Sequence, residues 1–178
     1  MYQTDTSRTE INKKLNMEYK DITSNVINRS KKSYTVQEQQ YYIENEKKYR
    51  VDGKNVILEP TTKEKEVANL LGEIYGGSIK IIPRINEPAG IKTPDYMIRN
   101  KKYDLKEIYG NSKNTLYNAI TKKKEQSDSF IFDISNTKME EIEAIEQIQG
   151  IYKSKHKNWV NEIILIKDNQ ILKMYKRT

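Results

Sequence analysis

The sequence predicts an α/β fold whose elements run helix, three strands, helix, strand, followed by a further helix and a closing β-hairpin. Three observations carry this prediction. Apolar residues at helical spacing end at Gly76-Gly77, two β-rich runs flank the polar residues 99–102, and the run 130–134 is almost entirely apolar. The 178 residues suffice for one such domain with an appended segment.

The first third of the chain carries weaker signals, and we predict an N-terminal helical and linker appendage over residues 1–59. Short amphipathic patterns predict helices at 11–17 and 36–49. Asp52-Gly53, between two β-rich runs, predicts a small hairpin. Residues 60–178 then form the second predicted unit, which holds the chemical core.

The core elements follow in order from local pattern. Thr61 or Thr62 before an acidic first turn is typical of a helix start, because a hydroxyl caps free amides and acids favour that end. That helix is expected to end at Gly76. The elements predicted after it are strands at 79–82, 96–98 and 103–108, a helix at 115–126, a strand at 130–134, a helix at 139–156 and a hairpin of 160–166 with 171–175.

Composition excludes several classes of site. The chain has no cysteine, which excludes disulfides, thiolate zinc sites and cysteine nucleophiles, and its single histidine excludes multi-histidine metal sites. It has no apolar run long enough to cross a bilayer and no signal-peptide core, so we expect a cytoplasmic protein without a membrane partner. A net charge of +7 favours polyanions, nucleic acid first, although lysine-rich genomes also produce basic proteins.

The strongest chemical signal is a pair of acids followed by a lysine. Residues two apart in a strand face the same side, so Asp104 and Lys106 point together, and Asp95 can reach that face across the hairpin. Two converging carboxylates suit a hard cation such as Mg²⁺. A neighbouring lysine can orient or deprotonate the attacking water, or stabilise charge on a phosphate. The pattern therefore predicts phosphodiester hydrolysis, with Asp95 and Asp104 as metal ligands.

Pro94-Asp95, then Asp104, one spacer and Lys106 resemble the signature of the PD-(D/E)XK nuclease superfamily. Its core also runs helix, three strands, helix, strand, so the resemblance implies a PD-(D/E)XK-like core. Members often place a glutamate on the first helix, which implies a catalytic role for Glu64. They often carry a glutamine on the second helix that faces the site, and Gln126 is similarly placed.

A closer resemblance covers roughly residues 60–150. It is to the C-terminal tRNase domain of CdiA-type contact-dependent inhibition toxins, which looks like a type IIS restriction endonuclease. It implies tRNA as substrate and an immunity protein as partner. Related domains also lie at the ends of phage minor head proteins, so a phage origin of this chain stays open. The residues that carry it are Glu64 to Leu71, Pro83, Gly90, Pro94-Asp95-Tyr96, Asp104-Leu105-Lys106, Ser112, Asn114-Thr115, Ala119-Ile120, Gln126 and Asp133-Ile134-Ser135.

Alternatives stay open at this point. A DNA endonuclease with the same site, or a non-catalytic nucleic-acid-binding or virion-associated module, would fit the same residues. A first-turn glutamate such as Glu64 commonly only favours the helix dipole. Lys122, in the run 122–124, and Lys113 are candidate phosphate contacts, although charge runs are usually solvated faces. Gln126 is the third candidate for contact with nucleic acid. Asp133, in its apolar strand, needs partners and is interpreted as structural.

Overall fold

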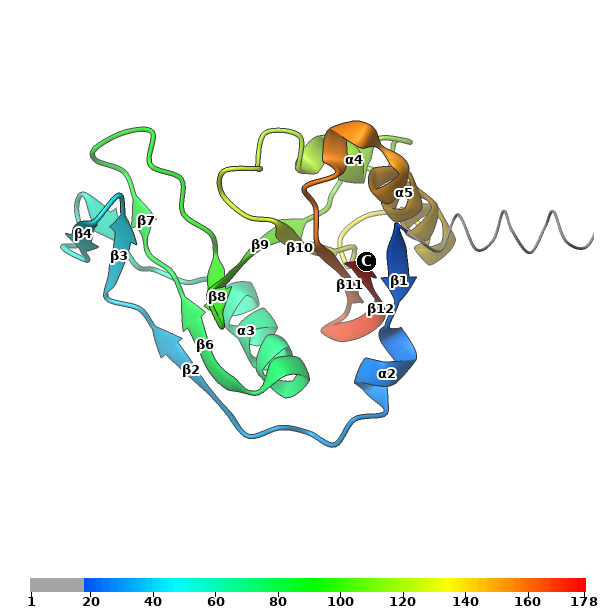
Figure 1. The fold of residues 1–178 in the computed structure, drawn as a ribbon, viewed down its shortest axis with the longest axis horizontal. Coiled ribbons are helices and arrows are strands. Elements are labelled where there is room, and N and C mark those ends of the chain that lie inside the picture. The colour runs from blue at the N-terminus through cyan, green and yellow to red at the C-terminus, as the bar shows by residue number, and fades with distance from the viewer. Residues whose placement is uncertain (1–17) are drawn as a thin grey trace, which may run out of the picture.

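Residues 18–178 are described by a computed structural model, and the helix expected at 11–17 lies outside them. The fold is a mixed eight-stranded sheet with helices on both faces (Figure 1). The strands are β1 (Tyr19–Asp21), β2 (Tyr34–Glu38), β3 (Tyr41–Glu44), β4 (Lys47–Arg50), β5 (Val56–Ile57), β6 (Gly77–Ile81), β7 (Arg84–Ile85), β8 (Tyr96–Ile98), β9 (Lys101–Glu107), β10 (Ser129–Asp133), β11 (Glu162–Lys167) and β12 (Gln170–Arg177). The helices are α2 (Thr23–Ile27), α3 (Thr62–Tyr75), α4 (Thr115–Ala119), α5 (Glu141–Lys153) and a 3-10 turn (Lys155–Lys157).

The large sheet has the order β1-β12-β11-β10-β9-β8-β6-β2. Strands β9, β10 and β11 run parallel at its centre, and β2 runs parallel to β6. The remaining neighbours pair antiparallel. The order α3, β6, β7, β8, β9, α4, β10, α5, β11, β12 confirms the predicted α/β class. The sequence of elements is as predicted except for β7, a short extra strand that pairs with β5 outside the large sheet. Assignment to the PD-(D/E)XK superfamily stays a prediction.

Helix α3 begins as its sequence predicts. The Thr61 hydroxyl accepts from the Glu64 amide at 3.1 Å, and the Glu64 carboxylate accepts from the Thr61 amide at 2.7 Å. This reciprocal capping box satisfies two amides that the first turn would otherwise leave free. Val67, Ala68 and Leu71 then face the sheet and are buried. The start of α3 is therefore fixed in place, and Glu64 with it.

Two apolar layers sandwich the central strands. Because side chains alternate along a strand, Phe130 and Phe132 of β10 face α4 and α5, while Ile131 faces α3. All five residues of β10 are buried, as expected for a central strand covered on both faces. The polar residues at the ends of these strands are therefore held by a rigid sheet.

The helix predicted at 36–49 is wrong, because this stretch forms β2, β3 and β4. Asn45 and Glu46 both have positive φ, 48° and 65°, which gives the tight turn of a β3–β4 hairpin. Asp52-Gly53 makes a local turn closed by bonds to Val56, but the flanking strands do not pair with each other: β4 pairs with β3, and β5 with β7.

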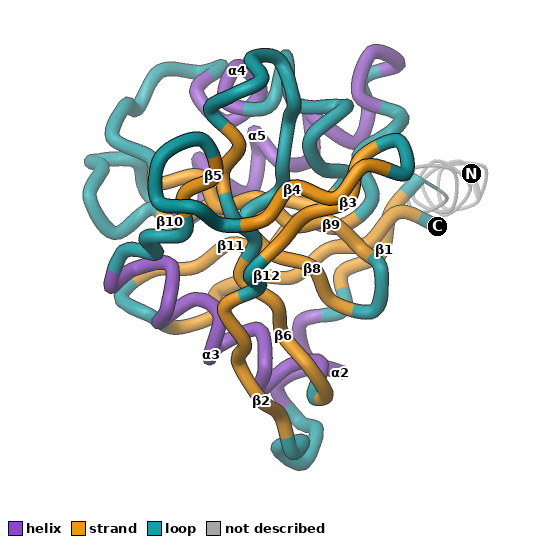
Figure 2. The backbone as a smooth tube through the Cα atoms, turned by 90° about the vertical axis from the view of Figure 1, so that its left-hand side faces the viewer, coloured by secondary structure: helices purple, strands orange, loops and turns teal. Residues whose placement is uncertain are grey.

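The described part of residues 1–59 also contributes to the large sheet. Strand β1 pairs with β12 at one edge and β2 pairs with β6 at the other (Figures 1 and 2).

The expected helix 115–126 is shorter than predicted, since α4 ends at Ala119 and turns follow it. No helix in residues 18–178 combines the length and apolar character that crossing a bilayer requires.

Candidate active site

The β8–β9 hairpin brings the two predicted metal ligands together. Tyr96 pairs with Tyr103, so Asp95 and Asp104 occupy the next opposed positions along the ladder. Tyr96 and Tyr103 face the α3 layer, and alternation turns both aspartates to the opposite face. The backbone carbonyl of Asp95 accepts from the Ile82 amide at 3.0 Å, which anchors the aspartate to the end of β6.

Asp104 is held from two directions. Its side chain is 1% exposed and lies 2.5 Å from the Lys106 ammonium, measured from Oδ2 to Nζ. Its Oδ1 accepts from the Gln126 amide at 3.3 Å, and the same amide donates to the Thr93 carbonyl at 2.8 Å. Gln126 thus ties the loop before Asp95 to Asp104. The predicted proximity of Gln126 to the site is present, through the turn after α4 and not through a helix.

Asp95 is in an unfavourable position for a charged carboxylate. Burial, together with the adjacent negative charge of Asp104, raises the pKa of Asp95 from 3.8 to about 8. Its Oδ2 still accepts the Leu105 amide at 2.7 Å, which offsets part of this cost. Two carboxylates in contact therefore have one negative charge too many at neutral pH, and a proton or a cation relieves it.

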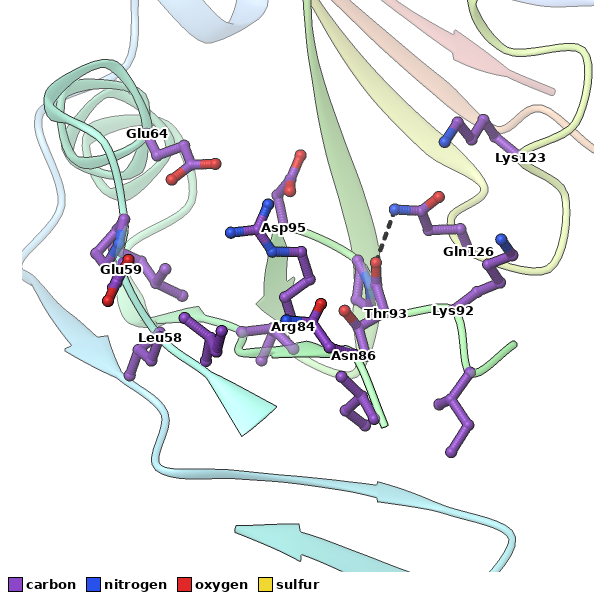
Figure 3. Close-up of a pocket in the computed structure, with 17 residues that line it drawn as sticks. Leu58, Glu59, Glu64, Arg84, Asn86, Lys92, Thr93, Asp95, Lys123 and Gln126 are labelled. Carbon is purple, nitrogen blue, oxygen red and sulfur yellow. Dashed lines mark hydrogen bonds between the residues drawn. The ribbon is translucent and has the colours of Figure 1, made fainter. Parts of the chain in front are cut away.

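Glu64 lines the same pocket from the first turn of α3, as Figure 3 shows. The helix is joined to the hairpin because the Tyr96 hydroxyl donates to the Glu64 carbonyl at 2.7 Å. The Glu64 carboxylate already has a partner in the capping box. A structural role for Glu64 is therefore directly visible, and its catalytic role stays a prediction.

A pocket of about 320 Å³ opens beside the carboxylate pair. Its walls come from the β5–β7 ribbon, the start of α3, the loop before β8 and the turn after α4 (Figure 3). Three cationic side chains line it, Arg84, Lys92 and Lys123. Burial and the positive charge of Lys106 lower the pKa of Lys123, which places this lysine close to the acid–lysine group.

These cations differ from the lysines named by the sequence. Lys122 is exposed and is not among the residues that line this pocket, whereas its neighbour Lys123 is. Lys113 lines a separate pocket between α4 and α5, with Glu143 and Glu146 opposite. Their binding to nucleic acid stays a prediction. The sequence does not show which lysine of the run 122–124 faces the pocket, because these residues lie in turns, where side-chain directions follow no regular period.

Asp133 has the structural role expected of it. Its side chain is buried and lies 3.0 Å from the Lys63 ammonium of α3. Burial alone would raise its pKa, but hydrogen bonds from Ser135 and Lys63 hold the pKa of Asp133 below its ordinary value. Neither residue of this pair lines the pocket, and the pair ties the first turn of α3 to β10.

The donor set of the carboxylate pair fits a hard cation. Asp104 Oδ2 is a buried oxygen without a hydrogen bond, its neighbour being the Lys106 ammonium. Mg²⁺ is commonly held by one or two carboxylates, with waters and substrate phosphates completing its shell. Across residues 18–178, no group of three or more acids or histidines is arranged to hold a metal unaided. Asp95 and Asp104 would therefore share it with water and substrate.

Part of the chain matches one known protein family. Residues 92–171 match the family described as the contact-dependent growth inhibition CdiA C-terminal domain. This stretch contains Asp95, Asp104, Lys106 and Gln126, and the match confirms the toxin-domain resemblance there. The chain is also similar to a solved structure, the CdiA-CT/CdiI toxin and immunity complex from Burkholderia pseudomallei. The identity is 15%, the TM-score is 0.48, and the similarity covers 78% of this chain and 98% of the other. A search of curated proteins gave no match.

Proposed function

We propose that this chain, whose residues 92–171 match a toxin-domain family, is a metal-dependent endonuclease. Its proposed substrate is RNA, with tRNA preferred on the family resemblance, and it is proposed to act in the cytoplasm, where tRNA is found. Asp95 and Asp104 are the proposed metal ligands, and Lys106 acts at the reacting phosphate. Glu64 supports the site from the start of α3.

The observation that carries the proposal is the carboxylate pair beside Lys106. Burying two acids in contact is costly, and Asp95 responds with a pKa of about 8. A fold gains nothing in stability from such repulsion, so the arrangement suits a group that titrates or binds a cation in function. The unpaired cations of the neighbouring pocket add attraction for a polyanion.

The residues divide the hydrolysis between them. A Mg²⁺ ion held by Asp95 and Asp104 would stabilise charge on the phosphate and lower the pKa of a bound water. Lys106, held 2.5 Å from Asp104, would orient the attacking water and stabilise the extra negative charge of the transition state. Water oxygen bonds to phosphorus and releases a proton to solvent, the bond to the leaving ribose oxygen breaks, and that oxygen takes up a proton from solvent. Gln126 keeps Asp104 aligned throughout.

A toxin of this kind needs an inhibitor in the cell that makes it. We therefore propose an immunity protein as a second partner, recognising the basic surface around the pocket. The test is to purify the complex of the two proteins and to assay cleavage. Activity should be lost in the complex and restored when the two proteins are separated.

The experiment is cleavage of total tRNA and of plasmid DNA by the purified chain, with Mg²⁺ and with chelator. We expect tRNA fragments with Mg²⁺ only. Asp104→Asn and Lys106→Ala should each lower the rate by about 100- to 1,000-fold, on the scale of losing one stabilising group in an active site. Circular dichroism of each variant checks that the fold is retained.

Asp133→Asn is the matched control, because Asp133 is equally buried and lysine-paired, but its partners are Lys63 and Ser135 and not the Asp95–Lys106 group. It should cleave like the parent chain. Cleavage of plasmid with intact tRNA would transfer the proposal to DNA. Intact tRNA and DNA at high protein concentration, with salt-dependent binding retained, would refute the nuclease and leave a binding module.

A further inference from the structure

We infer that the pocket beside the carboxylate pair binds one unpaired nucleotide of the substrate next to the bond that is cut. Arg84, Lys92 and Lys123 would bind the phosphates on either side of it. This inference rests on the proposed function and adds to it a requirement on substrate structure. The chain should cut single-stranded or looped RNA and spare continuous duplex.

The first support is the origin of the three cations. Arg84 comes from β7, Lys92 from the loop before β8, and Lys123 from the turn after α4, yet all three line one pocket with Asp95 (Figure 3). Hydrogen bonds fix that turn, because the amides of Gln126 and Ser127 donate to the Lys123 carbonyl at 2.9 and 3.0 Å. Cations gathered from three separate segments are not a charge run along one face.

The second support is that these cations have no anionic partner in residues 18–178. Lys63 and Lys106 are each paired with an aspartate, at 3.0 and 2.5 Å. No carboxylate of residues 18–178 lies within 4.0 Å of the charged groups of Arg84, Lys92 and Lys123. This holds although Glu64 and Asp95 line the same pocket. An unpaired cation beside an acid pair is available to a phosphate.

The third support is the size and lining of the pocket. Its volume of about 320 Å³ lies at the lower end of small-ligand pockets, the scale of one nucleotide and not of a duplex. Glu59 and Asn86 bring hydrogen-bonding groups to it, and Ile85 and Ile91 bring apolar surface. A base in a duplex is stacked and paired, whereas an unpaired nucleotide can be turned out into such a pocket.

The test presents one RNA sequence in three forms: a single strand, a perfect duplex, and a duplex with one unpaired nucleotide. We expect cleavage of the single strand, cleavage at the bulge, and at least tenfold slower cleavage of the duplex. Lys123→Met should weaken binding of a short 5′-phosphorylated single strand about tenfold. It should also reduce the slope of log affinity against log salt by about 0.7, the value for one phosphate contact on single strands.

Lys124→Met is the matched control, because Lys124 is an exposed neighbour that does not line the pocket, and its affinity should be unchanged. Equal cleavage of duplex and single strand would overturn the inference and leave the nuclease proposal intact. Equal losses in Lys123→Met and Lys124→Met would also overturn it. If no RNA is cut, the nuclease proposal fails, and the binding comparison of the two lysine variants still decides whether the pocket binds a nucleotide.

Discussion

Asp95→Asn should raise the stability of the fold while removing nuclease activity. The substitution keeps the shape of the side chain and an oxygen for the Leu105 amide, now 2.7 Å from Oδ2. It removes the charge that opposes Asp104, and the new amide can donate to that neighbour. Activity is lost because a neutral amide is a poor ligand for a hard cation.

The magnitude follows from the pKa of Asp95, raised from 3.8 to about 8 by burial and by Asp104. Between these values the folded chain holds a proton that the unfolded chain has released, so stability falls as pH rises through this window. One proton contributes at most about 1.4 kcal/mol per pH unit. The pocket opens to solvent, which screens the repulsion, so we expect about 2 kcal/mol between pH 5 and pH 8.

The assay is urea denaturation in chelator at pH 5 and pH 8, followed by circular dichroism. Asp95→Asn should exceed the parent chain by about 2 kcal/mol at pH 8 and by little at pH 5. Asp168→Asn, which removes an exposed acid in a distant turn, controls for net charge. Adding Mg²⁺ at pH 8 should stabilise the parent chain and not Asp95→Asn. Parallel pH profiles for parent and Asp95→Asn would refute the reasoning.

Three further predictions concern stability. Tyr103→Phe removes the hydroxyl that donates to the buried Glu162 carboxylate at 2.6 Å, so urea denaturation should show a loss of about 1–3 kcal/mol with cleavage unchanged; an unchanged midpoint would contradict this. Gly72→Ala should destabilise by about 1–3 kcal/mol because its new methyl group overlaps the Tyr34 ring, and adding Tyr34→Ala should recover part of the loss. Lys63→Met leaves the buried Asp133 unpaired and should cost about 2–3 kcal/mol at pH 7. That cost should shrink in acid, since the stability from a carboxyl of lowered pKa is lost as pH falls through its folded value; a pH-independent cost would exclude the ion pair as the cause.

The acid pair and Lys106 could be predicted because they lie on one hairpin. Strand alternation alone places Asp104 and Lys106 on one face, and the pairing across residues 99–102 brings Asp95 opposite. Gln126 was placed near the site by the resemblance and not by periodicity. Arg84, Lys92 and Lys123 could not be predicted in the pocket, because turns and a two-residue ribbon orient them, and such segments have no repeat to read.

The missed β3–β4 hairpin has a similar cause. Three hairpins in the described chain turn on two residues with positive φ, Asn45-Glu46, Arg99-Asn100 and Asp168-Asn169. The second and third stood between runs of recognisable strand character and were predicted. Around Asn45 the tyrosines at 41, 42 and 49 also fit a helical spacing, and that pattern outweighed the asparagine turn signal.

The pairing of β1 with β12 has a mechanical consequence. Tyr19 lies opposite Arg177 and Asp21 opposite Tyr175, so residues 18 and 178 leave the same end of one antiparallel pair. Tension between these two points would therefore break the hydrogen bonds between β1 and β12 one after another, and would not load all of them together in shear. Beyond β1, only α2 and the segment to β2 separate this edge from the opposite edge of the sheet. Force applied at residue 18 would therefore detach the two edge strands, β1 and then β2, before it reached the strands that hold Asp95 and Asp104.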